Sequence, residues 1–275
     1  MEEEDYIKES DLPFQPKPIS LKEMEILGNL AKSHICKIKC KNGSHGTGFF
    51  CNIPIGWNDY LKVFMTNNHV LDINDIQPGQ IINFSLDNDY KDFQIIIDNS
   101  RETYTNKDYD VTIIEIKKED KIDEKSFFDL DKQIFKENAF EIFRNNQIYL
   151  LHYPKGEELV ISPGVIKSIT IDNKTIQHLC SSSGGSSGSP IINKNNYQVI
   201  GIHKGSPASG NKYNLGTLLK EPLENFNEEV KIKKNQTGNN KDNNINKNNK
   251  ENKKIVIEEK KEIKCEEKEK NEKKR

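Results

Sequence analysis

The sequence predicts an all-β protein in which two six-stranded antiparallel β-barrels precede a short C-terminal helix and a disordered charged tail. Short apolar runs, broken by Asn, Asp and Gly turns, fill residues 33–220 and fall into two groups of about six. A polar stretch at about 117–146 separates the two groups. Evenly spaced short strands of this kind favour two small barrels over one sandwich or an alternating α/β fold.

The expected organisation has four parts. Residues 1–25 are an acidic lead-in, 26–125 the first barrel, and 126–232 the second barrel with the C-terminal helix. Helical spacing of three apolar residues predicts that helix, and they are Leu223, Phe226 and Val230. Residues 233–275 are rich in Asn, Lys and Glu, so they are expected to be disordered or only partly helical.

The composition limits the classes of protein to which the chain can belong. The 275-residue chain has a formal net charge of -2, which gives no reason to expect a nucleic acid or an anionic membrane as partner. Its apolar runs fall well short of the roughly 20 residues of a membrane span. Its first residues lack the basic-then-apolar order of a secretory signal. We expect a soluble cytoplasmic protein with a protein or peptide substrate and no cofactor, and the oligomeric state stays open.

The run "HICKIKC" opens the first strand group. Its alternation predicts a half-buried strand with small thiols facing the core and Lys37 and Lys39 on the other face. A zinc site is the alternative, but no C-x2-C knuckle is present. Its ligands would be His34, Cys36, Cys40 and His45. The core interpretation is preferred, and no metal is expected.

The run "CSSSGGSSGSPIIN" has the composition of a flexible linker but passes straight into an apolar strand. Serine-dependent hydrolysis needs a hydroxyl on a sharp exposed turn, and Ser187 has that position. Gly185 would let the backbone present its N–H beside that of Ser187 as an oxyanion hole. Gly188 would leave room for a substrate. The alternative is a plain Ser/Gly loop.

Two further residues could complete the chemistry. His69 follows the apolar strand in "VFMTNNHVL", where a rigid element can hold a general base beside a cleft. Asp110 begins the apolar strand "DVTIIEI" and could orient an imidazole, and Asp108 is its nearest competitor. Each signal is weak alone. Taken together they are stronger, because His69 and Asp110 come from one strand group and Ser187 from the other, as expected for a site between two barrels.

These motifs resemble those of the trypsin/chymotrypsin-type serine peptidases. The resemblance covers about residues 33–225 and rests on "GTGFF", "MTNNHVL", "DYDVTIIEI", "GGSSGSPIIN" and "VIGIHKGSP", all in family order. It implies a double-barrel fold, His69 as general base, Asp110 as its orienter, Ser187 as nucleophile, and the Gly185 and Ser187 amides as oxyanion hole. The sequence is most similar to glutamyl endopeptidase-type members.

The departures from the family pattern are informative. Val70 stands where extracellular members carry a cysteine after the histidine, so that disulfide cannot form. Ser186 and Ser189 replace the acid and the second glycine of "GDSGGP". Without that acid, activation through an ion pair to a freed amino terminus is not expected.

The resemblance also suggests which residues recognise substrate. It implies that His203 lies on the strand that walls the specificity pocket, with Ser182 on the opposite wall. A histidine and a hydroxyl together suggest a preference for Glu or Gln before the scissile bond, and Lys204 would add positive charge. The competing function is a catalytically silent module that binds or scaffolds a partner.

Overall fold

The computed structural model describes residues 15–56, 59–172, 174–208 and 212–233. The chain divides into two compact units, Met1–Phe226 and Asn227–Arg275, and both strand groups belong to the first. Most of the predicted tail, from residue 234 onward, lies outside the described residues, as do residues 1–14 of the predicted lead-in.

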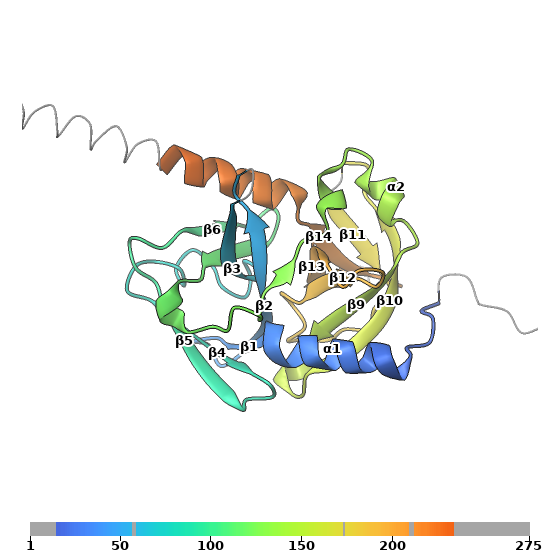
Figure 1. Cartoon of the computed structure of the whole chain (residues 1–275), viewed down its shortest axis with the longest axis horizontal. Helices are drawn as coiled ribbons and strands as arrows, with labels where there is room; N and C mark the ends of the chain where they lie inside the picture. Colours follow the sequence, from blue (N-terminus) through green and yellow to red (C-terminus); the bar gives the residue numbers. More distant parts are fainter. Residues whose placement is uncertain (1–14, 57–58, 173, 209–211, 234–275) are drawn as a thin grey trace, which may run out of the picture. The chain divides into compact units, whose positions relative to one another are not determined.

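The first strand group forms one curved sheet (Figure 1). Seven antiparallel strands are paired in the order β5-β4-β1-β2-β3-β7-β6, and the short β8 pairs with β2 in parallel. The strands are β1 (Ile35–Lys39), β2 (His45–Pro54), β3 (Tyr60–Thr66), β4 (Ile81–Leu86), β5 (Lys91–Ile96), β6 (Thr103–Asn106), β7 (Val111–Glu115) and β8 (Phe128–Asp129). Phenylalanine rings fill its concave side, with Phe50 in contact with Phe64, Phe84 and Phe127.

The second strand group closes into a six-stranded barrel in the order β10-β11-β14-β13-β12-β9. Its strands are β9 (Gln147–His152), β10 (Val160–Ile169), β11 (Thr175–His178), β12 (Pro190–Asn193), β13 (Val199–Gly205) and β14 (Asn214–Leu218). The predicted double-barrel fold is therefore confirmed. The first half differs in detail, because its described strands pair along an open path with an extra strand, β8.

The polar stretch between the halves contains short elements that the strand pattern did not predict. They are the 3-10 helices η1 (Lys118–Asp120) and η2 (Lys132–Phe135) and the helix α2 (Ala139–Phe143), and η3 (Pro154–Gly156) follows β9. Just after β8, Leu130 bridges Val199 of β13, and the Asp131 carboxylate accepts hydrogen bonds from Asn193 and Asn196. The connection is thus bonded to both halves.

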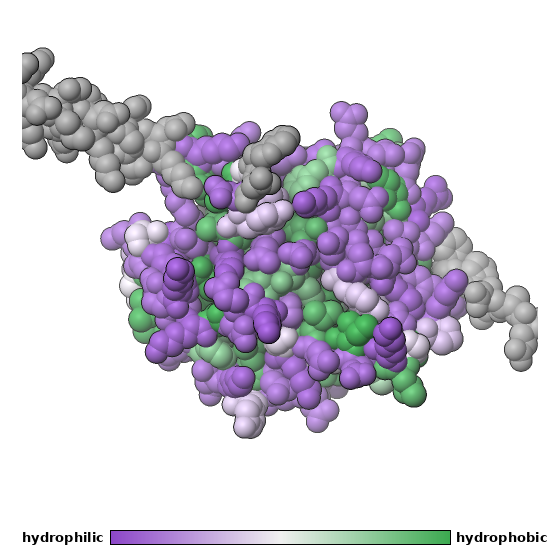
Figure 2. Space-filling view, in the orientation of Figure 1, coloured by the Kyte–Doolittle hydropathy of each residue, from purple (hydrophilic) through white to green (hydrophobic). Residues whose placement is uncertain are grey.

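Helix α1 (Leu21–His34) was not predicted. It begins within the expected acidic lead-in, where Ser20 and Glu23 form a capping box, which is a recognised helix start. The helix contacts β1 and β4 of the sheet and β10 of the barrel (Figure 1). Glu23 accepts a 2.6 Å hydrogen bond from the Tyr149 hydroxyl of β9. Leu21 and Met24 of α1 are exposed apolar residues. The face of the molecule seen in Figure 2 is mainly hydrophilic, with scattered apolar areas.

Strand β1 covers Ile35–Lys39 of the run "HICKIKC", whereas His34 ends helix α1, and one side chain of the strand also differs from the prediction. Lys37 is buried rather than solvent-facing, because Asp89 binds its ammonium at 2.5 Å and the ring of Tyr153 lies 5.1 Å from it. Among the described residues, no three His, Cys, Asp or Glu side chains converge as metal ligands would. His34 packs on Phe128, and Cys36 lies in the core.

Residues 220–233 are helical, and the three apolar residues that predicted this helix are all buried. The ring of Phe226 contacts that of Tyr104 in β6. Within the described ranges, no helix is both long and apolar enough to cross a membrane.

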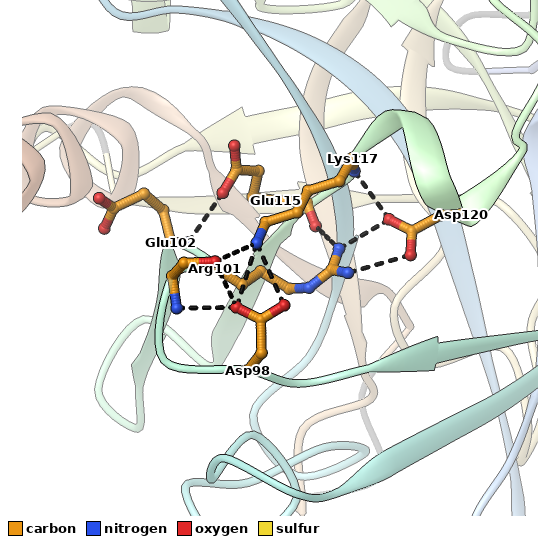
Figure 3. Close-up of polar contacts among 7 residues, drawn as sticks. Asp98, Arg101, Glu102, Glu115, Lys117 and Asp120 are labelled. Carbon is orange, nitrogen blue, oxygen red and sulfur yellow. Dashed lines mark hydrogen bonds and ion pairs between the residues drawn. The ribbon is translucent and has the colours of Figure 1, made fainter.

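An ion-pair cluster joins the two chain ends of the β6–β7 hairpin (Figure 3). The buried Arg101 guanidinium donates to both carboxylate oxygens of Asp120, at 2.7 and 3.0 Å, and to the Glu115 carbonyl at 2.6 Å. Beside it, Lys117 donates to both oxygens of Asp98 at 3.1 Å, and hydrogen bonds from Ser100 and Lys117 lower the pKa of Asp98. The cluster lies at the open end of the hairpin, and Asp110 belongs to the turn at the other end.

Replacing Arg101 by Met is expected to lower the free energy of unfolding by about 3–5 kcal/mol, because Asp120 would keep a buried charge without its partner. Urea unfolding followed by circular dichroism measures this. Lys117→Met is the matched control: the Asp98 carboxylate is half exposed, so loss of this ion pair should lower the stability much less than loss of the Arg101 pair. Equal effects of the two changes would contradict this assignment.

Candidate active site

His69 and Asp110 are joined by two hydrogen bonds. The backbone N–H of His69 donates to Asp110 Oδ1 at 3.0 Å, and His69 Nδ1 lies 2.7 Å from Oδ2. Asp110 has a left-handed backbone (φ 55°), and Asn67 donates to its carbonyl at 2.8 Å. The Asp110 side chain is largely covered, whereas the His69 ring is half exposed. Asp110 therefore fixes the orientation of the ring and leaves its other edge open.

Ser187 lies on the turn between β11 and β12. Its hydroxyl donates to the Lys204 carbonyl at 3.2 Å, and in the described part of the chain no hydrogen bond joins it to His69. Catalytic hydrogen bonds are often loose in the absence of substrate. Asp108 has no bond to His69 either; its N–H donates to Asn106.

The two predicted oxyanion-hole donors belong to the turn that carries Ser187. The backbone N–H groups of Gly185 and Ser187 have no acceptor among the described residues. Gly185 has φ +88°, and a Cβ there would lie 2.6 Å from the Tyr153 carbonyl oxygen. A side chain is thus excluded by both conformation and space.

The structure gives a different reason for glycine at position 188 from the one expected. Its φ is +89°, and a Cβ would lie 2.1 Å from the Thr47 carbonyl oxygen and 2.3 Å from Thr66 Oγ1. The close approach comes from β2 and β3 of the other half rather than from the space expected for substrate.

The three predicted substrate-binding residues have different surroundings. The His203 ring is buried, and its Nδ1 lies 3.1 Å from His178 Nε2. Ser182 is half-buried. Lys204 lines a cavity of 320 Å³ with Asp108, Tyr109 and Thr217. Burial lowers the pKa of Lys204, and the charge of Asp110 partly offsets this.

A second cavity, of 450 Å³, opens beside His69. Its lining includes Cys40, Lys41, Asp72 and Asp75. The Lys41 ammonium lies 3.1 Å from Asp75. This space is next to the general-base candidate and is large enough for a side chain of an extended peptide.

Buried polar groups that the sequence did not predict lie under the turn that carries Ser187. The His152 ring lies between two hydroxyls, with Nδ1 at 2.7 Å from Ser186 Oγ and Nε2 at 2.9 Å from Ser162 Oγ. Burial lowers the pKa of His152 to about 4, so the ring is neutral near pH 7. From the other half, Thr47 donates its hydroxyl to the Gly185 carbonyl at 2.7 Å and its N–H to the Ser187 carbonyl at 2.8 Å. The only sequence signal for Thr47 was its place in the "GTGFF" motif.

Solved structures of proteases have a similar fold. The M. tuberculosis protease Rv3671c in its inactive form is 18% identical, with a TM-score of 0.52, and the match covers 75% of this chain and 93% of that chain. A Glu endopeptidase in complex with MPD is 15% identical, with a TM-score of 0.51, and the match covers 73% and 91%. At these identities the likeness shows the fold.

The comparison with curated protein sequences finds no match. The family model of the trypsin-like peptidase domain matches residues 46–202, which include the candidate histidine, aspartate and serine. This match spans more than half of the chain. The chain therefore belongs to the family of trypsin-like peptidase domains.

Proposed function

We propose that this chain is a serine endopeptidase that hydrolyses peptide bonds through an acyl-enzyme. Ser187 is the nucleophile, His69 the general base, and Asp110 the group that orients it. The observation that carries the proposal is the pair of hydrogen bonds from His69 to Asp110, which leaves Nε2 as the ring nitrogen available for proton transfer.

The reaction begins with a rotation of the Ser187 hydroxyl from the Lys204 carbonyl toward His69 Nε2. Ser187 Oγ then bonds to the scissile carbonyl carbon while its proton passes to Nε2. The carbonyl oxygen becomes an oxyanion and accepts hydrogen bonds from the N–H groups of Gly185 and Ser187. The C–N bond breaks, His69 gives the proton to the leaving amine, and water releases the acyl group by the same steps.

A fluorophosphonate probe with mass-spectrometric mapping tests this. The expected result is labelling of Ser187 that is lost in Ser187→Ala and His69→Ala. Ser181→Ala is the matched control, because Ser181 is an exposed serine of the same run. Absence of labelling in a folded protein would overturn the proposal.

One observation favours a second candidate, a catalytically silent module that binds a partner. The Ser187 hydroxyl is bonded to the Lys204 carbonyl instead of to His69. A silent module would stay unlabelled by the probe, and a crystal structure with a bound peptide would keep that bond. An active peptidase would form the Ser187–His69 hydrogen bond.

We further propose a preference for Glu or Gln before the scissile bond. His203 precedes Lys204, whose carbonyl accepts the Ser187 hydroxyl, so His203 belongs to the strand beside the nucleophile. Burial lowers the pKa of His203 well below its usual value, and a neutral ring can donate one hydrogen bond to a carboxylate or an amide. A site built this way discriminates strongly against side chains without an acceptor.

A peptide library with Glu, Gln, Lys or Leu before the scissile bond measures this preference. Cleavage after Glu or Gln, lost in His203→Phe while labelling of Ser187 persists, is expected. Cleavage after Lys or Leu would show that His203 has no such role.

A further inference from the structure

The two proposed oxyanion donors belong to peptide groups whose carbonyls are both held. In a trans peptide the C=O and the N–H point to opposite sides of the chain. The N–H of Lys155 donates to the Gly184 carbonyl, which is the other end of the peptide group that carries the Gly185 N–H. Holding Gly184 O on one side therefore turns the Gly185 N–H to the other.

Ser189 does the same for the second donor. Its hydroxyl donates to the Ser186 carbonyl at 2.7 Å, and its backbone N–H lies 3.2 Å from the same oxygen. That carbonyl shares a peptide group with the Ser187 N–H. Ser189 is fully buried, so its hydroxyl is not a substrate contact. A glycine at position 189 would lack the hydroxyl and therefore its hydrogen bond to the Ser186 carbonyl.

Ser186 lies between the two peptide groups and is held through its hydroxyl. The Ser186 hydroxyl accepts from the Ser183 N–H at 3.1 Å and bonds His152 Nδ1 at 2.7 Å. A neutral imidazole has one donor and one acceptor, and Ser186 and Ser162 satisfy both, whichever nitrogen carries the proton. Both Ser186 and His152 are buried, so loss of either partner would leave an unsatisfied polar group in the core.

We propose that Ser189 and His152 are positioning residues of the oxyanion hole: Ser189 aims the Ser187 N–H, and His152, through Ser186, fixes the backbone between the two donors. This deepens the proposed function and rests on it for its catalytic consequence. Neither residue touches substrate. The two serines that depart from the family motif thus have one shared task, to hold the turn that presents Ser187.

Steady-state kinetics on Ser189→Ala and His152→Phe tests this, with Ser181→Ala as the matched control. Misaimed oxyanion donors weaken transition-state binding more than substrate binding, so kcat should fall about ten- to a hundredfold with KM little changed. A role in folding alone would lower the amount of folded enzyme, measured by circular dichroism, without changing kcat per labelled active site. If His152→Phe fails to fold, Ser189→Ala decides, because its backbone hydrogen bond to Ser186 remains.

Amide NMR spectra of the same proteins separate this inference from the proposed function. The Gly185 and Ser187 amide signals should shift in Ser189→Ala and stay in place in Ser181→Ala, whether or not the wild type turns over substrate. Shifted signals in a protein that no probe labels would support the positioning role and overturn the peptidase. Unshifted signals and an unchanged kcat in Ser189→Ala would overturn the positioning role and leave the peptidase standing.

Discussion

Replacing Asp110 by Asn is expected to lower kcat by about 10⁴-fold with little change in KM or stability. The Asp110 carboxylate accepts from both the backbone N–H and Nδ1 of His69. An amide has only one acceptor oxygen, so its NH₂ would face one of these nitrogens and disfavour the tautomer that leaves Nε2 free to take a proton. Asn tolerates the left-handed backbone at this position, so the turn itself should persist.

Asp108→Asn is the matched control, since Asp108 has no bond to His69. It should retain near wild-type kcat. Steady-state kinetics with one cleavable peptide, together with thermal unfolding of each variant, checks both expectations. Equal activity of the Asp110→Asn variant and the wild type would mean that Asp110 does not orient the base.

Acid is expected to unfold the protein through its buried histidines before most carboxylates titrate. Burial lowers the pKa of His152 to about 4 and that of His178 to about 3, against about 6.5 for an exposed imidazole. At a pH between the lowered pKa values and 6.5, these histidines are protonated in the unfolded chain and neutral in the folded chain. The free energy of unfolding therefore falls as the pH drops from about 6.5 toward 4, by about 2–3 kcal/mol per histidine at about pH 4.5.

Urea unfolding at about pH 7 and pH 4.5 measures this loss, which is a large share of the roughly 5–15 kcal/mol that stabilises a typical domain. His178→Gln should show a smaller pH dependence than the wild type, because it removes one of four buried histidines whose pKa is lowered, the others being His34, His152 and His203. Equal stability of the wild type at the two pH values would show that these rings are protonated in the folded chain.

Much of the architecture and the candidate site could be predicted from local patterns. Short apolar runs in two groups were enough for the double-barrel fold, because strand period and turn residues are local signals. His69 and Asp110 were predicted as partners from their places at strand ends, and the hydrogen bonds between them follow from β3 and β7 being neighbours. Helix α1 was missed although its start, Ser20 with Glu23, was readable.

Contacts between segments far apart in the chain could not be predicted from local sequence patterns. The alternation of "HICKIKC" assigned Lys37 to an outer face, but nothing local indicated that Asp89 and Tyr153 would cover it. The roles of Thr47 and His152 depend on which backbone carbonyl or hydroxyl lies opposite, which only the packed turn determines.

The contact of Thr47 with the turn that carries Ser187 has a consequence for synthesis of the protein. Two carbonyls of that turn, those of Gly185 and Ser187, are held by a residue of the first half, and Gly188 is seated against the same residue. The strands of the first half precede residue 187 in the chain, so they leave the ribosome before the serine does. The turn would therefore reach this conformation only after the second half packs against Thr47, and under the proposed function proteolytic activity would mark the completion of folding.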